Sequence, residues 1–178
     1  MLLLGGSMNA TSDCDGVEAM HLSPKIVVGL ARIYTVVAAL IDTNILVYRF
    51  DSRYPAKQKI VSELLRAGAR DGSLRIPHQA LLEFVAVMSR IKTGGQRLLS
   101  WQEILRETEE LLIVFPTLYP NASMFRTALR GVTAYQLSWF DAHLWAYAEH
   151  FGMEELLSED FEQGRVYGSV RVVNPFLA

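Results

Sequence analysis

Four acidic residues lie where the chain could bring carboxylates together: Asp42, Glu83, Asp141 and Asp160. Asp42 follows the apolar run "VVAALI" and Asp160 follows "ELLSE", so both come at the end of a predicted strand. Glu83 lies in the apolar stretch "QALLEFVAV", and Asp141 comes three residues after Ser138 in "SWFD". Carboxylate oxygens are the ligands that Mg²⁺ and Mn²⁺ prefer in proteins. The four acids are therefore candidate ligands of a divalent cation.

Each acid also has a simpler structural explanation. Asp42 or Asn44 could cap a helix, Asp141 could complete a Ser-x-x-acid capping box, and Asp160 could be an acid favoured in a first helical turn. Glu83 could lie at the border of its helix and reach solvent. Taken singly, each explanation is stronger than a catalytic role. Taken together they weaken, because four carboxylates at the helix starts of a parallel sheet would repel one another without a cation.

Other kinds of catalytic site find little support in the sequence. The histidines of the core region, His78, His143 and His150, form no HExxH motif and have no cysteine partners. There is no GxSxG, P-loop or GxGxxG motif either. A phosphoryl-accepting aspartate of the haloacid-dehalogenase type needs a second aspartate where this chain has Asn44. A divalent metal that activates water for attack on a phosphodiester is the chemistry that remains.

The elements that must position these acids alternate between short apolar runs and amphipathic segments. We expect Leu81, Leu82, Val85 and Met88 to share one side of their helix. Such alternation predicts an α/β fold, with a parallel sheet between helices and the site at the carboxyl ends of the strands. One predicted helix starts at Asn44, and the others cover 55–70, 78–92, 100–112, 122–131 and 138–152. The predicted strands cover 34–41, 113–117, 155–160 and 170–176, and residues 71–77 are predicted to be a turn and a short strand.

Length and composition suit one globular domain. The chain has 178 residues, of which 51% are hydrophobic and 20% charged, and its net charge is -2. This charge excludes a strongly basic surface for non-specific binding of nucleic acid, but it allows an acidic site that meets phosphate through a metal. The single cysteine, Cys14, agrees with a reducing cytoplasm. We expect residues 1–33 to be an N-terminal extension without a secretory signal, residues 34–178 to form the domain, and no segment to cross a membrane.

Four segments together resemble the PIN-domain family, and most of all its VapC-type toxins. They are "LIDTNILVY", "LLEFVAVMSR", "YQLSWFDAHLWAYAEHFG" and "LLSEDFEQGRVYGSVRVVNPF", and they occur in the order and with the spacing typical of that family over residues 36–176. The resemblance implies a three-layer sandwich in which helices flank a central parallel sheet of four to five strands. It also implies that the four acids named above bind Mg²⁺ or Mn²⁺, with support from Thr43, Asn44 and Ser158.

The resemblance further implies a metal-dependent endoribonuclease, the toxin of a toxin–antitoxin pair. Its expected partners are an RNA substrate, a cognate antitoxin and a second copy of the chain in a homodimer. The candidate residues for steering RNA are Arg49, Arg53, Arg90 and Lys92. Two alternatives stay open: a PIN-like scaffold with an impaired site, and a receiver-type domain phosphorylated on Asp42, although "VRVVNPF" lacks the lysine that such a domain needs.

Overall fold

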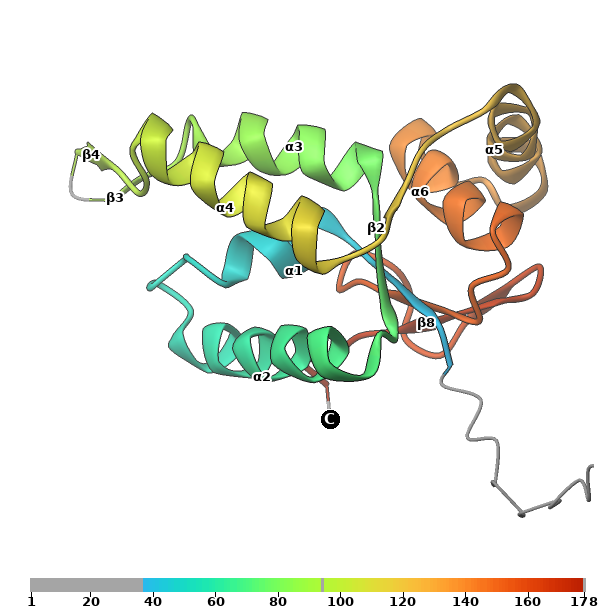
Figure 1. Ribbon diagram of the computed structural model, residues 1–178. Coiled ribbons are helices and arrows are strands. Elements are labelled where there is room, and N and C mark those ends of the chain that lie inside the picture. The colour runs from blue at the N-terminus through green and yellow to red at the C-terminus, as the bar shows by residue number, and fades with distance from the viewer. Residues whose placement is uncertain (1–36, 94, 178) are drawn as a thin grey trace, which may run out of the picture. The chain divides into compact units, whose positions relative to one another are not determined.

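The computed structural model describes residues 37–93 and 95–177 (Figure 1). The predicted extension over residues 1–33 lies outside these described residues, as do the first three residues of the strand predicted at 34–41. Within the described part, no helix is both long enough and apolar enough to cross a membrane.

A six-stranded sheet forms the centre of the fold, with the strand order β5-β2-β1-β6-β8-β7. Each pair of neighbours from β5 to β8 is parallel, and only β7 runs antiparallel to β8. The five parallel strands confirm the predicted sheet, and β7 adds an antiparallel edge. The strands are β1 (Ala39–Ile41), β2 (Leu74–Pro77), β5 (Thr117–Leu118), β6 (Glu155–Leu157), β7 (Val166–Tyr167) and β8 (Val170–Val173).

Helices cover both faces of this sheet, as the resemblance implied (Figure 1). A separate two-stranded hairpin, β3 (Lys92–Thr93) with β4 (Gln96–Arg97), follows α3. The helices are α1 (Thr43–Tyr48), α2 (Pro55–Asp71), α3 (His78–Met88), α4 (Trp101–Val114), α5 (Ala122–Tyr135) and α6 (Trp139–His150).

The core is divided between the two faces because side chains alternate along each strand. In β1, Ile41 packs with residues of α1 to α4, whereas Leu40 packs with residues of α5 and α6. In β6, Leu157 belongs to the first core and Leu156 to the second. The sheet is thus buried on both faces, and the acids that follow β1 and β6 emerge at its carboxyl edge.

Several predicted boundaries were wrong. The helix predicted over 78–92 ends at Met88, and the chain then enters the hairpin of β3 and β4. The segment predicted as a strand over 113–117 is helical through Val114 and forms β5 only from Thr117. Leu82 is 60% exposed, so it does not share the buried side of α3. Two residues along a helix turn by about 200°, which places Leu82 opposite the buried Phe84.

Candidate functional site

Asp42 is the most deeply buried of the four candidate acids, with 7% of its surface exposed. It follows β1 directly and is the N-cap of α1, where its Oδ1 accepts a hydrogen bond of 2.6 Å from the backbone N–H of Thr43. Its Oδ2 accepts two more hydrogen bonds, from the Ser158 hydroxyl at 2.6 Å and from Asn44 Nδ2 at 3.1 Å. The capping role that the sequence suggested is therefore real, but it occupies only one of the two carboxylate oxygens.

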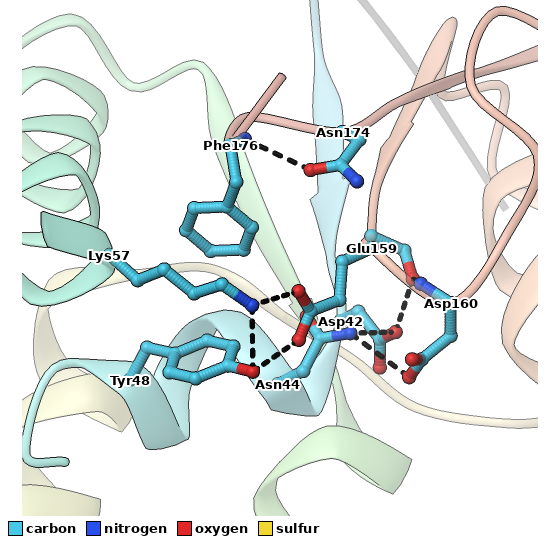
Figure 2. Close-up of polar contacts among 9 residues, drawn as sticks. Asp42, Asn44, Tyr48, Lys57, Glu159, Asp160, Asn174 and Phe176 are labelled. Carbon is cyan, nitrogen blue, oxygen red and sulfur yellow. Dashed lines mark hydrogen bonds and ion pairs between the residues drawn. The ribbon is translucent and has the colours of Figure 1, made fainter. Parts of the chain in front are cut away.

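Asn44 joins Asp42 to Asp160 (Figure 2). Its Nδ2 donates to Oδ2 of both residues at 3.1 Å, so these two oxygens are at most twice that distance apart. Ser158 supports the same arrangement, because its Oγ also accepts a hydrogen bond of 3.1 Å from the Asp160 N–H. The predicted supporting residues Asn44 and Ser158 thus contact the acids that they were expected to support.

The charge of Asp42 is destabilised at this place. Burial raises its pKa to about 6, against the lowering effect of hydrogen bonds from Ser158 and Thr43. The negative charges of Asp160 and Glu83 raise the pKa further. An acid with these surroundings favours either a proton or a bound cation.

Glu83 reaches the same region from α3. Its Oε2 accepts a hydrogen bond of 2.7 Å from the Thr43 hydroxyl, and its Oε1 accepts one of 2.8 Å from Gln79 Nε2. The Oε1 of Gln79 lies 2.6 Å from His143 Nδ1 on α6. Because Gln79 uses its amide N–H groups on Glu83 and the Phe140 carbonyl, His143 must donate to the remaining oxygen. Glu83 is therefore held in a fixed orientation by Thr43 and Gln79.

Asp141 is placed differently from the other three acids. Its Oδ2 accepts a hydrogen bond of 2.7 Å from the Ser138 hydroxyl, whose Oγ in turn accepts from the Asp141 N–H at 3.2 Å. These contacts match the capping explanation. The link to the other acids is indirect: the carbonyl of the preceding Phe140 accepts a hydrogen bond of 3.3 Å from Gln79, which holds Glu83.

The explanation of Asp160 as a first-turn acid was wrong. Residues 159–161 form a bend after β6, and no helix follows them in the described part of the chain, which runs to residue 177. The side chain of Asp160 contacts Asn44 instead, which is consistent with a role at the site.

The donor set has the chemistry that a hard cation prefers, since every candidate ligand is an oxygen. Asn44 Oδ1 is buried and has no hydrogen-bond partner among the described residues, so one further oxygen at the site is unsatisfied. Among residues 37–93 and 95–177, however, no three His, Cys, Asp or Glu side chains are grouped closely enough to hold a metal ion. What the structure brings together is the Asp42–Asp160 pair, with Glu83 close enough to affect the pKa of Asp42.

Two of the four basic residues predicted to steer RNA are engaged elsewhere. Arg49 forms ion pairs with Glu107 and Glu110, and Arg53 forms one of 2.6 Å with Asp51. Arg90 and Lys92 are exposed beyond the end of α3, and their role stays a prediction.

The sequence analysis missed Gln79 and a group of three further residues around the site. Gln79 lies one helical turn before Glu83, and this i, i+4 spacing was a usable signal. Tyr48, Lys57 and Glu159 form the group of three. No local pattern could have revealed it, because Lys57 and Glu159 are separated by 102 positions in the chain.

Comparison with known proteins gives the same family that the four sequence segments resembled. The solved structures similar to this chain include a toxin–antitoxin complex from Klebsiella pneumoniae, with 21% identity, a TM-score of 0.55, and coverage of 78% of this chain and 98% of that one. They also include FitAcB from Neisseria gonorrhoeae, with 17% identity, a TM-score of 0.53 and the same two coverages. No curated protein sequence matches the chain. The model of the PIN domain matches residues 39–169, a span that contains all four acids, and the chain therefore belongs to the PIN domain family.

Proposed function

We propose that the protein is a metal-dependent endoribonuclease. The observation that carries this proposal is the environment of Asp42 in a PIN-family chain. A buried carboxylate with a pKa of about 6 shares the Asn44 amide with Asp160 and has Glu83 close by. Burying and clustering these charges costs folding free energy, and a bound divalent cation would offset that cost by relieving their repulsion.

The chain's own residues would have distinct tasks in this function. Asp42, Glu83, Asp141 and Asp160 would hold Mg²⁺ or Mn²⁺. Thr43, Asn44 and Ser158 would orient the carboxylates through the hydrogen bonds described above. When bound, the metal would offset the charge of an RNA phosphate and lower the pKa of a water molecule enough for attack on phosphorus.

Cleavage of RNA by the purified protein tests this function. With Mg²⁺ or Mn²⁺ we expect products with a 5′-phosphate and a 3′-hydroxyl, because water and not the ribose 2′-hydroxyl is the nucleophile. EDTA and the substitution Asp42→Asn should each remove most of the activity. Undiminished cleavage in EDTA, or products that end in a 2′,3′-cyclic phosphate, would contradict the metal mechanism.

We further propose that this nuclease is the toxin of a toxin–antitoxin pair and acts on RNA in the cytoplasm. Support comes from the family and from the similarity in fold to the Klebsiella toxin–antitoxin complex. The proposed partners are an antitoxin that covers the acidic site and a second copy of the chain. Co-expression with the product of a small neighbouring gene should yield a complex, which a size measurement would detect. The complex should not cleave RNA.

A further inference from the structure

Three consecutive residues after β6 contact three different residues of the segment that begins at Asp42. Ser158 donates to Asp42, Glu159 accepts from the Tyr48 hydroxyl at 2.5 Å, and Asp160 accepts from Asn44. The bend after β6 is thus held along the length of α1 by one contact per residue. Of these three contacts, only the one between Tyr48 and Glu159 lies outside the acidic site described above.

Lys57 completes that middle contact (Figure 2). From the first turn of α2 its Nζ donates to Glu159 Oε2 and, at 2.9 Å, to the Tyr48 hydroxyl. The two charged side chains are mostly covered, with 27% of Lys57 and 19% of Glu159 exposed. An ion pair shielded in this way is stronger than an exposed one, and leaving one partner alone there is costly.

Aromatic rings surround the ammonium group of Lys57. Nζ lies 4.2 Å from the centroid of the Tyr48 ring and 4.8 Å from that of Phe176, in the range of cation–π contacts. The rings of Tyr48 and Phe176 also pack edge to face at 5.3 Å. These contacts limit the movement of Lys57, so its position is set by α1, α2 and the C-terminal segment together.

From these contacts we infer that Lys57 and Tyr48 are positioning residues of the acidic site, acting on Asp160 through Glu159. This inference rests on the proposed function. Glu159 is covalently next to Asp160, and its carboxylate is bound to Lys57 and Tyr48 rather than to the groups around Asp42. Released from them, Glu159 would no longer anchor the backbone that places Asp160 against Asn44.

Manganese affinity of the metal-free protein tests the inference, because positioning and simple electrostatics predict opposite results. Lys57→Met removes a positive charge close to the site, so electrostatics alone predicts tighter binding of Mn²⁺. Loss of positioning predicts weaker binding, with the dissociation constant raised by about tenfold, as is typical when the partners of metal ligands are removed. Tyr48→Phe changes no charge and keeps the ring. It should weaken binding by severalfold, whereas electrostatics predicts no change.

Glu162→Gln is the matched control. Glu162 lies three residues beyond Glu159 and has its own basic partner, Arg165, at 2.9 Å, but both side chains are exposed. We expect this variant to bind Mn²⁺ like the wild type. The inference is overturned if Lys57→Met, shown to be folded by circular dichroism, binds Mn²⁺ as tightly as the wild type or more tightly. Unchanged binding by Tyr48→Phe would overturn the role of Tyr48.

The side-chain amide signals of Asn44 give a second readout that needs neither metal nor RNA. In ¹⁵N NMR spectra of metal-free protein, both Lys57→Met and Tyr48→Phe should shift these signals, because Asn44 loses its contact with Asp160. Glu162→Gln should leave them in place. If the wild type bound no Mn²⁺, the proposed metal-dependent function would be wrong. The Asn44 signals would then show by themselves whether Lys57 and Tyr48 position Asp160.

Discussion

At the scale of single residues, the main feature of the molecule is the cost of ionising Asp42. Its pKa rises from 3.8 to about 6 on folding, so the folded state holds this proton more tightly than the unfolded state. The contribution of Asp42 to the free energy of unfolding is therefore largest below about pH 4. It falls as the pH rises towards 6 and is constant above that value. A shift of this size corresponds to about 3 kcal/mol.

The first prediction is that Asp42→Asn removes this pH dependence. In EDTA, the stability of the variant relative to wild type should improve by about 2 kcal/mol between pH 4 and pH 7, because only the wild type must ionise a buried acid. Denaturant unfolding at each pH measures the difference. Glu109→Gln, at an exposed position of α4, is the control and should show no such trend. A stability difference independent of pH would mean that Asp42 ionises freely.

The second prediction concerns Asp141, whose contacts in the structure are those of a helix cap. If it is also a metal ligand, saturating Mn²⁺ should raise the melting temperature of the wild type more than that of Asp141→Asn. Ser138→Ala should melt lower, since an N-cap is worth about 1 kcal/mol, but it should keep the wild-type response to Mn²⁺. Equal responses of wild type and Asp141→Asn would leave Asp141 as a cap only.

The positions of the acids that follow strands could be predicted from the sequence, but most of the side chains that contact and orient them could not. The positions of Asp42 and Asp160 after β1 and β6 could be predicted, because a parallel sheet brings its carboxyl ends to one edge. Glu83 could be predicted as an acid in an apolar helix. The contacts of Tyr48 and Lys57 with Glu159 could not be predicted, because they depend on how α1 and α2 pack beside the bend after β6.

At the scale of elements, α6 carries Asp141 and His143 and is positioned mainly by α5. The packing of α5 against α6 depends on Gly131, where an added Cβ would lie 2.6 Å from ring carbons of Trp145. That ring cannot move freely, because its Nε1 donates a hydrogen bond of 2.9 Å to the Tyr167 carbonyl and Tyr135 packs on its side. The close approach of α5 and α6 thus requires a residue without a side chain.

The third prediction follows from this contact. Gly131→Leu should lower the free energy of unfolding by about 2 kcal/mol, since overpacking a close contact forces the two helices apart. The melting temperature should fall by about 4–8 °C for a chain of this size. Ala134→Leu introduces the same side chain at an exposed position of the same helix and should change stability little. Equal stability of the two variants would show that α5 and α6 can separate without cost.

Helix starts were more predictable than helix ends. The helices predicted from residues 100 and 122 start within one residue of those positions, where Ser100 caps α4 and Asn121 caps α5. By contrast, α3 ends at Met88, before its predicted end at residue 92, and α4 continues to Val114 although the sequence there favoured a strand. At both helix ends, the local sequence preference did not predict where the helix stops.

At the scale of the whole molecule, the six-stranded sheet brings Asp42 and Asp160 to one edge, and α3 places Glu83 close to them. The proposed toxin function leads to the fourth prediction. Expression of the wild type alone should arrest bacterial growth, and Asp42→Asn should relieve the arrest while the protein stays folded. Growth curves with matched protein levels measure this, with Glu109→Gln as a variant that should remain toxic. Equal toxicity of Asp42→Asn would place the cause of the arrest outside this site.

If the acids around Asp42 hold a divalent metal, the metal-free protein must bind Mn²⁺, and a titration measures this binding. Electron paramagnetic resonance of the free ion gives the dissociation constant for the wild type, Asp42→Asn, Asp160→Asn and the control Glu109→Gln. We predict that the wild type and the control bind Mn²⁺ alike, and that each aspartate variant binds it at least tenfold more weakly, because a neutral amide is a poor ligand for a hard cation. A wild type that binds no Mn²⁺, or aspartate variants that bind it as well as the wild type does, would contradict a metal site at these acids.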